Sequence, residues 1–571
     1  MAHVHRTRTV SSPTDRVVIV GAGLAGLSAG LYLRGAGRDV TILESNSSVG
    51  GRVGVYQGND YSIDNGATVL TMPELVEDAL AAVGADPAST NPKFVVHKLD
   101  PTYHARFADG TALDVHADPE DMAAEVSRVC GPEEAQRYRA LRRWLNRIFD
   151  AEFDRFMDAD FDSPLGLVNS RDAVKDLSRL VALGGFGKLG GQVDRKIRDP
   201  RLRRIFTFQA LYAGVAPSRA LAVYGAIAHM DTSLGVYFPE GGMRTIAESM
   251  ADAFTETGGI LHLGRTVERL EVSDRRVHTV HTRDGERFDC DAAVLTPDMA
   301  VTDSLLRPHT RLRPRPVRTS PSAVVIHGTV SSAVADEWPA QRHHMIDFGE
   351  AWKRTFAEIT ARRGRGRLMS DPSLLVTRPA QTDPSLVFSR DGRIREPLSV
   401  LAPCPNLDSA PLDWEVLGPA TCVKSSSRCK NVAIRDWWRG SISITSTPRR
   451  PGSKRAWPRV ARSRRHTPSP RRGRSDARTS PAASTTSFSP DREPFRGWEY
   501  RPFCCPDGSP PNVLPVHASE PARWALVRAT KLAPRNRPFI HDSPTRALHA
   551  PIDTDLLGGG TCTDDVLCRS H

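Results

Sequence analysis

Three glycines and one acidic residue near the N-terminus have the types and the spacing of a dinucleotide-binding site. The segment RVVIVGAGLAGLSAGLYLRGAGRDVTILE (16–44) contains G-x-G-x-x-G at Gly21, Gly23 and Gly26. The first glycine permits a tight turn, the second lets a pyrophosphate approach the backbone, and the third lets a helix pack closely on a strand. Glu44 follows where a carboxylate can accept hydrogen bonds from ribose hydroxyls and repel a 2′-phosphate.

The surrounding pattern predicts the elements that must position these residues. The β-branched run at 16–20 predicts a buried parallel strand, and 39–43 predicts a second strand that ends at Glu44. Between them, residues 24–33 have helical spacing, so the first N–H groups of that helix should face the phosphates. A glycine-rich hairpin is the alternative, but it explains neither Glu44 nor the two strands.

The next segment is SNSSVGGRVGVYQGNDYSIDNGATVL (45–70). It resembles the second signature of the flavin amine oxidase and phytoene desaturase superfamily. The resemblance implies that Gly50 and Gly51 wrap the pyrophosphate of FAD and that Arg52 adds a charge-assisted donor. It also implies that the loop around Gly66 lies near the isoalloxazine ring. In isolation, Gly50–Arg52 could equally be a hairpin turn with an exposed arginine.

A third stretch, at 238–298, extends the resemblance. Gly241-Gly242-Met243 precedes a predicted helix, and the strand after that helix begins near Val267. In the family, the backbone at the position of Val267 meets the adenine. The segment DAAVLTPD (291–298) predicts a strand that returns the chain to the first sheet.

Segments between residues 323 and 420, such as HHMIDFGEAWKRTFAEI, resemble bacterial phytoene desaturases, and the resemblance runs over 16–420. It implies an α/β fold with a Rossmann-type FAD-binding domain, a sheet-based substrate domain and a helical membrane-associating region. The predicted boundaries are a flexible N-terminus (1–15), the first part of the FAD domain (16–95), a substrate and helical region (96–234), the second part of the FAD domain (235–305), the substrate sheet (306–420) and an irregular tail (421–571).

The implied reaction removes hydrogen across an unactivated C–C bond beside a polyene. Because no ordinary side chain accepts a hydride, FAD must do so, while the protein supplies an apolar tunnel that aligns the substrate and excludes water. We identify no Ser/His/Asp or paired-carboxylate site and predict no catalytic base. C40 phytoene is the expected substrate; a C30 analogue or a later carotenoid is the alternative.

A lipophilic substrate implies peripheral contact with the cytoplasmic membrane from the cytoplasmic side. The charged amphipathic stretch 137–157 fits a membrane-associating helix, although a solvated surface helix explains it equally well. The uncharged run 17–33 barely reaches the length of a membrane span and is interrupted by glycines. Oligomeric state is not indicated.

Cysteines and histidines suggest no metal site. Only three cysteines precede residue 421, as in a reduced cytosolic chain, and Cys504-Cys505 lack a partner at zinc spacing. Adjacent side chains on a strand point to opposite faces. We therefore expect one of His343 and His344 in the core and the other at the surface.

The charge is concentrated in one segment. Residues 448–480 contain eleven Arg, one Lys and one acidic residue, a net charge equal to the +11 of the whole chain. The rest of the chain therefore sums to zero, and the high pI is not a sign of nucleic-acid binding. Three explanations of the tail compete: a natural disordered basic tail, a fused nucleic-acid module, and translation in the wrong reading frame.

Back-translation favours the third explanation. With suitable synonymous codons, residues 421–429 in a shifted frame read Leu-Arg-Glu-Glu-Leu-Leu-Glu-Val, an amphipathic helix. In the same frame, residues 495–508 permit Pro-Gly-Val-Gly-Val-Pro, which matches the second flavin motif of the desaturases. We therefore predict that one nucleotide is missing, or two are added, near codon 421. The out-of-frame tail should then be irregular, make few contacts with residues 16–420 and leave the FAD domain without its closing strand.

Overall fold

The computed structural model describes residues 15–58, 61–153, 157, 171–274, 276–310, 319–390 and 392–412, and three short strands further along the chain. Its strands form a five-stranded sheet, a nine-stranded sheet, a three-stranded meander and two strand pairs. All of these residues belong to one compact unit, Met1–Thr530. The mixed α/β class expected from the sequence is confirmed.

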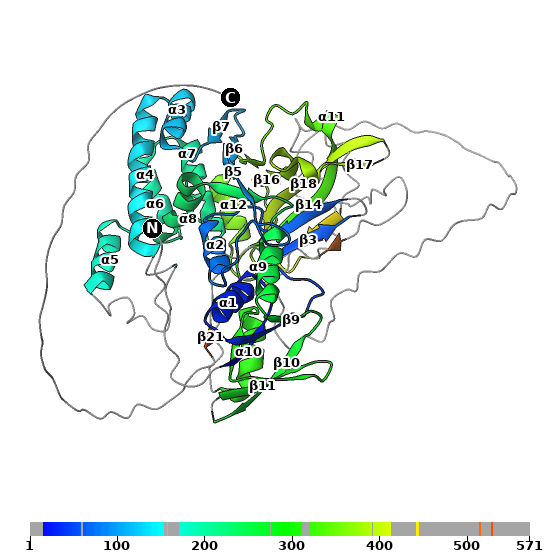
Figure 1. Cartoon of the computed structure of the whole chain (residues 1–571). Helices are drawn as coiled ribbons and strands as arrows, with labels where there is room; N and C mark the ends of the chain where they lie inside the picture. The colour runs from blue at the N-terminus through cyan, green and yellow to red at the C-terminus, as the bar shows by residue number, and fades with distance from the viewer. Residues whose placement is uncertain are drawn as a thin grey trace, which may run out of the picture. The chain divides into compact units, whose positions relative to one another are not determined.

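The first sheet gathers strands from two distant parts of the sequence. β13 (Ala292–Leu295), β1 (Arg16–Val20), β2 (Asp39–Leu43) and β9 (Ile260–His262) lie side by side in this order and run parallel. Helix α1 (Leu24–Gly35) connects β1 to β2 and packs beside α9 (Arg244–Glu256) (Figure 1). The two strands and the helix predicted between residues 16 and 43 are confirmed.

The meander and two strand pairs complete this half of the molecule. β10 (Val267–Ser273), β11 (Arg276–Thr282) and β12 (Arg287–Asp289) are antiparallel, and α10 (Met299–Leu306) packs against β10. The strand pairs are formed by β3 (Val53–Gln57) with β4 (Ser62–Gly66) and by β5 (Val96–Leu99) with β8 (Val236–Pro239). Helix α2 (Glu74–Ala81) packs against α1 and α9.

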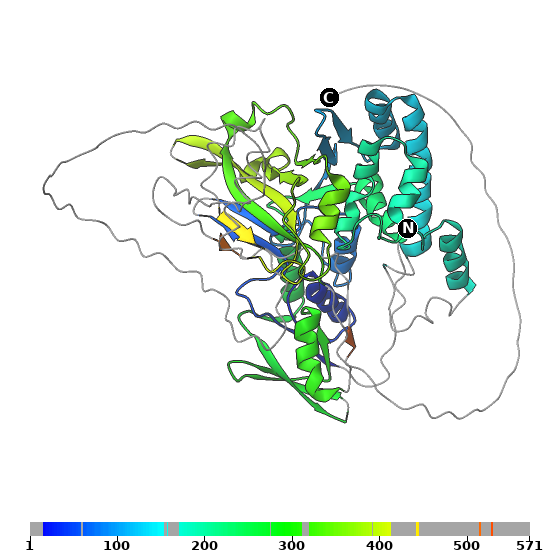
Figure 2. The ribbon, with the colours of Figure 1, turned by 180° about the vertical axis from the view of Figure 1, so that it is seen from behind.

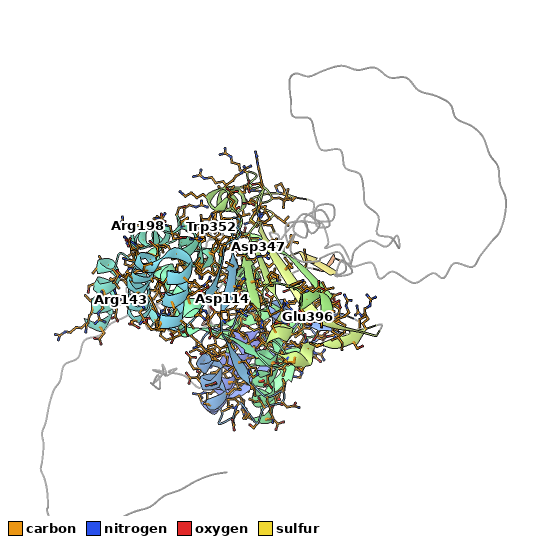
Figure 3. All side chains as sticks on the ribbon, turned by 90° about the horizontal axis from the view of Figure 1, so that it is seen from above. Asp114, Arg143, Arg198, Asp347, Trp352 and Glu396 are labelled. Carbon is orange, nitrogen blue, oxygen red and sulfur yellow. The ribbon has the colours of Figure 1, made fainter. Side chains whose placement is uncertain are left out.

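The nine-stranded sheet is built around two long antiparallel strands, β14 (Ser322–Ser331) and β18 (Arg393–Cys404), which pair over ten residues (Figure 2). Their inward side chains, such as Val324, Ile326 and Val400, form a separate buried cluster. Asp114, Asp347 and Glu396 mark three of the strands in Figure 3. The other strands of the sheet within residues 96–412 are β6 (Tyr103–Arg106), β7 (Ala112–Val115), β15 (His344–Asp347), β16 (Leu374–Thr377) and β17 (Phe388–Arg390).

Most of the remaining helices come from residues 119–234. Asp118 caps the first of them by accepting hydrogen bonds from Glu120 N and Asp121 N, and α4 buries Tyr138, Leu141, Leu145 and Ile148 at helical spacing. Among the described residues, no helix is both long and apolar enough to cross a membrane. These helices are α3 (Pro119–Cys130), α4 (Pro132–Glu152), α5 (Arg171–Ala182), α6 (Leu189–Lys196), α7 (Pro200–Ile205), α8 (Gly225–His229) and the π-helix η5 (Met230–Leu234). Two short helices, α11 (Ser332–Ala335) and α12 (Trp352–Ile359), follow β14 and β15.

The expectation for the histidine pair is wrong, because both side chains are buried. His343 is 5% exposed and His344 is 1% exposed. His343 precedes β15, stacks edge-on against Phe238 at 4.5 Å and hydrogen-bonds Thr382 Oγ1 through Nδ1 at 2.7 Å. Tyr103 covers His344, with ring centroids 5.9 Å apart. Both faces are covered at this end of the sheet, so alternation along the strand exposes neither ring.

The predicted frame change and most of the predicted irregular tail lie outside the described residues. Three short strands of the tail are described: β19 (Ser441–Ile444), β20 (Val513–Leu514) and β21 (Val527–Arg528). β19 pairs with β14, and β21 pairs antiparallel with β13. The prediction was a mostly irregular tail with few contacts to residues 16–420, and these three strands are short. The prediction that no strand of the tail borders the first sheet is wrong for β21, which pairs with β13 through Val527 and Arg528.

Candidate functional site

The two glycine-rich segments predicted to hold a pyrophosphate meet face to face. Gly50 N donates to the Ala22 carbonyl at 2.9 Å, and Gly23 and Gly50 form an isolated parallel bridge. A Cβ on Gly51 would lie 3.1 Å from the Gly23 Cα, and Gly51 has a φ of +57°. Side chains would therefore fill the space between the two loops, which is the space that a diphosphate needs.

The other two glycines of the first motif solve different steric problems. Gly21 has a φ of +105°, and a Cβ there would meet Thr296 Oγ1 at 2.6 Å. A Cβ on Gly26 would collide with the Gly21 carbonyl, so the first turn of α1 can lie against the end of β1 only because Gly26 lacks a side chain.

The N-terminus of α1 is suited to an anion. Its N-cap is Gly23, which has no side-chain cap, and its first turn contains no acidic residue. The first N–H groups of a helix have no partner within the helix and carry a partial positive charge. A phosphate at this point would supply the missing cap.

Glu44 lies at the end of β2 and is 5% exposed. Its Oε2 accepts from Ala22 N at 2.8 Å, and its Oε1 accepts from Asn46 N at 2.8 Å and from Ser45 Oγ at 3.1 Å. A carboxylate has about four lone-pair sites, so these three donors leave room for a ribose hydroxyl. Glu44 therefore also anchors the glycine loop, a contact that its position in the sequence did not indicate.

Val267 is brought toward Glu44 by backbone hydrogen bonds. Glu44 N donates to the His262 carbonyl at 2.9 Å, and Arg265 N donates to the Glu44 carbonyl at 2.7 Å. Two residues later, Val267 begins β10 and pairs with Thr282. The residues predicted for the nucleotide end of the cofactor thus converge at one edge of the first sheet: Gly21, Gly23, Gly26, Glu44 and Val267.

Arg52 and Gly66 lie on the other side of the glycine loops. Arg52 Nη2 donates to Asp298 Oδ2 at 2.5 Å, and both side chains remain partly exposed. Gly66 ends β4 with a φ of +141°, and a Cβ there would collide with the Arg52 carbonyl. Arg52 is therefore held at the loop by a carboxylate that follows the returning strand β13.

A buried carboxyl joins the loop before Gly66 to helix α9. Asp64 Oδ2 accepts from Met243 N at 2.9 Å, at the N-terminus of that helix. Burial raises the pKa of Asp64 to about 7, although the backbone donors at Met243 and Arg244 lower it. Asp383 Oδ2 accepts from Gly241 N at 2.7 Å in the same turn.

Sequence reasoning missed three positioning residues, namely Thr296, Asp298 and Asp383. Thr296 Oγ1 donates to the Val20 carbonyl at 2.8 Å and covers Gly21. Thr296 and Asp298 belong to the segment TPD directly after β13, so their place at the end of a parallel strand was a usable signal. Asp383 lies more than 140 residues from its partner Gly241, and no local pattern indicated it.

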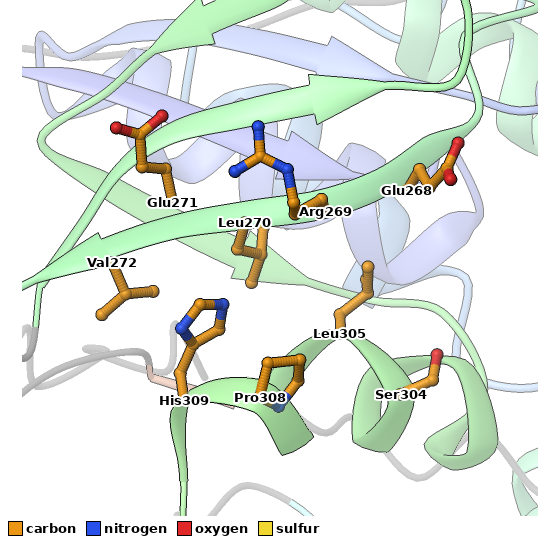
Figure 4. Close-up of a pocket in the computed structure, with 9 residues that line it drawn as sticks. All are labelled: Glu268, Arg269, Leu270, Glu271, Val272, Ser304, Leu305, Pro308 and His309. Atoms are coloured by element: carbon orange, nitrogen blue, oxygen red, sulfur yellow. The ribbon is translucent and has the colours of Figure 1, made fainter.

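A surface pocket of about 240 Å³ lies between β10 and the end of α10 (Figure 4). Its lining mixes charged and apolar side chains, including Arg269, Leu270, Ser304 and His309. None of the predicted site residues lines this pocket. In the part of the chain that the structure describes, no group of three or more His, Cys, Asp or Glu side chains could hold a metal ion.

These residues fit a flavin dinucleotide. The space between the opposed glycine loops, the uncapped helix N-terminus and the partly satisfied carboxylate of Glu44 suit a diphosphate and a ribose. Chemically, this arrangement can bind and orient a redox cofactor, because none of these side chains accepts electrons itself.

Comparison with known proteins agrees with this fit. A family model described as flavin-containing amine oxidoreductase matches residues 24–376. The chain is 51% identical over 415 residues to phytoene dehydrogenase from Streptomyces griseus, an alignment that covers 72% of this chain and 77% of that protein. It is 29% identical to a zeta-carotene-forming phytoene desaturase from Myxococcus xanthus (74% and 78% covered) and 28% identical to a carotenoid 3,4-desaturase from Haloarcula japonica (65% and 73% covered).

Proposed function

The chain belongs to the family of flavin-containing amine oxidoreductases, and we propose that it is an FAD-dependent desaturase of a carotenoid precursor. One observation carries the proposal: the glycine loops and Glu44 form a dinucleotide cradle in a chain that is 51% identical to a phytoene dehydrogenase over most of its length. C40 phytoene is the proposed substrate. The likeness to a carotenoid 3,4-desaturase supports a later carotenoid as the second candidate.

Each residue of the cradle has a proposed role in holding FAD. Gly21, Gly23 and Gly26 shape the turn into α1, and Gly50 and Gly51 close over the diphosphate from the other side. Arg52, oriented by Asp298, donates to a phosphate oxygen. Glu44 accepts from the ribose, the Val267 backbone faces the adenine, and Gly66 lets the chain bend beside the ring system.

When bound, FAD supplies the hydride acceptor that the side chains lack. The protein's own contribution is positional. The loops of β3 and β4 would hold one edge of the cofactor, and the substrate would lie beside the nine-stranded sheet. Excluding water there prevents side reactions during hydrogen removal.

We also propose that the helical region contacts the cytoplasmic membrane peripherally, from the cytoplasmic side. Helix α5 supports this, since Val174 and Val181 lie seven residues apart, about two helical turns, and are 50% and 61% exposed. Phe186, 45% exposed, follows the helix. Exposed apolar side chains on an amphipathic helix favour binding in a lipid interface.

The function is tested in a host that accumulates phytoene. The chain as written is expressed beside a version in which the reading frame after codon 421 is restored, and the pigments are analysed by chromatography. We expect the restored chain to form desaturated, coloured products. The chain as written should bind less FAD and form little product, because the predicted second flavin motif is missing. Phytoene left unchanged by the restored chain, with a lycopene-forming desaturase active in the same host, would contradict the proposed function.

A further inference from the structure

A loop rich in arginine lies between α12 and β16, and the cofactor cradle uses none of its side chains. The segment ARRGRGR (361–367), which we call the arginine loop, contains no acidic residue. Over residues 353–367, six basic residues stand against one acidic residue, a net charge of +5. The four arginines of the loop are all exposed: Arg362, Arg363, Arg365 and Arg367.

The backbone of the arginine loop is fixed to a neighbouring segment of the chain. Gly364 N donates to the Asp408 carbonyl at 3.1 Å, and Gly366 N donates to the Ser409 carbonyl at 2.9 Å. Ser409 Oγ donates to the Ala361 carbonyl at 2.9 Å. The loop therefore has a defined conformation, and its arginine side chains, rather than its backbone, are available to a partner.

The arginines of the loop have no ion-pair partner within the described residues. None of the four side chains forms a hydrogen bond or an ion pair with another residue that the structure describes. Glu358, the acid that precedes the loop, is already engaged: its Oε1 accepts from Arg354 Nε at 3.1 Å and its Oε2 accepts from Ser370 N at 2.8 Å. Four like charges within six residues repel one another, so a surface with negative charge would bind there favourably.

A contact from the helical region extends this positive charge. Arg219 Nη2 donates to the Thr360 carbonyl at 3.2 Å, directly before the arginine loop. Lys188 Nζ in turn donates to the Arg219 carbonyl at 3.3 Å. Both side chains are exposed. Six basic side chains from three parts of the chain are therefore joined by these contacts.

Exposed apolar side chains border the basic cluster. Lys188 pairs with Leu221 in an isolated antiparallel bridge, and Leu221 is 37% exposed. Phe186, two residues before Lys188, is also exposed, as is Val181 at the end of α5. Apolar side chains gain nothing from contact with water, but they stabilise binding when they enter a lipid interface.

A membrane of acidic lipids fits this combination better than a nucleic acid does. Phosphate groups of either partner can pair with arginine. Nucleic-acid sites, however, also stack bases on aromatic rings or contact base edges. Val181 and Leu221 are aliphatic and cannot stack in this way, whereas aliphatic side chains do enter the boundary between headgroups and acyl chains.

We propose that the arginine loop, with Arg219 and Lys188, binds the phosphate groups of acidic phospholipids. The three exposed apolar side chains enter the boundary between headgroups and acyl chains. This inference rests on the proposed function, because a lipid-soluble substrate must be taken from a membrane, and it names the lipid charge on which the proposed peripheral contact depends. Each basic side chain near an acidic membrane strengthens binding about fivefold.

The test is vesicle binding by the full chain in a background without the charge of its tail. The eleven arginines and one lysine of residues 448–480 are changed to serine in every protein compared, because they would bind acidic vesicles by themselves. Co-sedimentation is measured with vesicles of phosphatidylcholine alone and with vesicles of equal parts phosphatidylcholine and phosphatidylglycerol. We expect tighter binding to the acidic vesicles, and this preference should weaken as salt is added. Equal binding to both kinds of vesicle overturns the proposal.

Two variants with the same change in charge identify the surface. The loop variant combines Arg362→Ser, Arg363→Ser, Arg365→Ser and Arg367→Ser. The control combines Arg269→Ser, Arg283→Ser, Arg287→Ser and Arg307→Ser, all exposed in the meander and after α10, away from α12 (Figure 1). The loop variant should lose roughly 10²–10³-fold in affinity for acidic vesicles, and the control much less. Equal losses in the two would show that only net charge matters and would overturn the proposal.

The remaining outcomes are equally decisive. If circular dichroism shows that the loop variant is unfolded, Arg363→Ser with Arg365→Ser decides, and an unchanged affinity in that double variant overturns the proposal. Binding of a single-stranded DNA oligonucleotide that the loop variant loses, with vesicle binding unchanged, overturns it in favour of a nucleic acid. The vesicle measurements need neither FAD nor substrate, so they decide the inference alone, whereas the absence of desaturated pigment in the phytoene-accumulating host counts against the proposed function.

Discussion

Single residues at the nucleotide end serve both the fold and the cofactor. Glu44 holds the Ala22 and Asn46 N–H groups, so Glu44→Ala should weaken FAD binding by roughly 1–3 kcal/mol and also lower the free energy of unfolding by a similar amount. Fluorescence titration with FAD and thermal unfolding of the cofactor-free chain measure the two losses separately, and Glu74→Ala, at an exposed position of α2, is the control. Gly23→Val should be worse, because its side chain would occupy the space opposite Gly51. Unchanged flavin content in Gly23→Val would remove the Rossmann assignment.

Strand β4 and helix α9 meet at the turn before α9, where a carboxyl from β4 replaces the usual side-chain cap of the helix. The Met243 N–H is satisfied by Asp64, 179 residues away in the sequence. Asp64→Ala should therefore lower the free energy of unfolding by about 1–2 kcal/mol, the usual effect of losing a cap. Asp64→Asn keeps an acceptor oxygen and should retain most of the stability. Chemical denaturation of both variants checks this order, and equal losses in the two would show that charge, rather than the hydrogen bond, matters there.

For the whole molecule, three buried carboxyls predict a pH dependence of stability. Burial raises the pKa of Asp64, Glu152 and Asp231 to between about 7 and about 8. At pH values between the pKa of such a carboxyl in the unfolded chain and its raised pKa in the folded chain, the folded state binds more protons. Each of the three carboxyls therefore makes the free energy of unfolding fall as pH rises, by at most about 1.4 kcal/mol per pH unit. Denaturation of the cofactor-free chain at several pH values should therefore show a shallower loss above pH 5 in Glu152→Gln than in the parent. An identical slope in both would contradict the buried, neutral state of that carboxyl.

The sequence by itself determined the local parts of the nucleotide site. Glycine spacing, the β-branched strands and the acid at the end of the second strand are read from neighbouring residues, and the structure has these elements at the predicted positions. The same local rule failed for His343 and His344, because alternation along a strand predicts opposite faces but not whether both faces are covered.

Only the tertiary structure decided which distant groups meet. Asp298 orients Arg52 across 246 positions, and Asp383 holds Gly241 across 142. The contact of Tyr103 with His344 likewise depends on the parallel pairing of β6 with β15. Such contacts follow from the packing of sheets and helices around shared cores, and burial then sets the pKa of groups such as Asp231. No periodicity or spacing within a short segment contains that information.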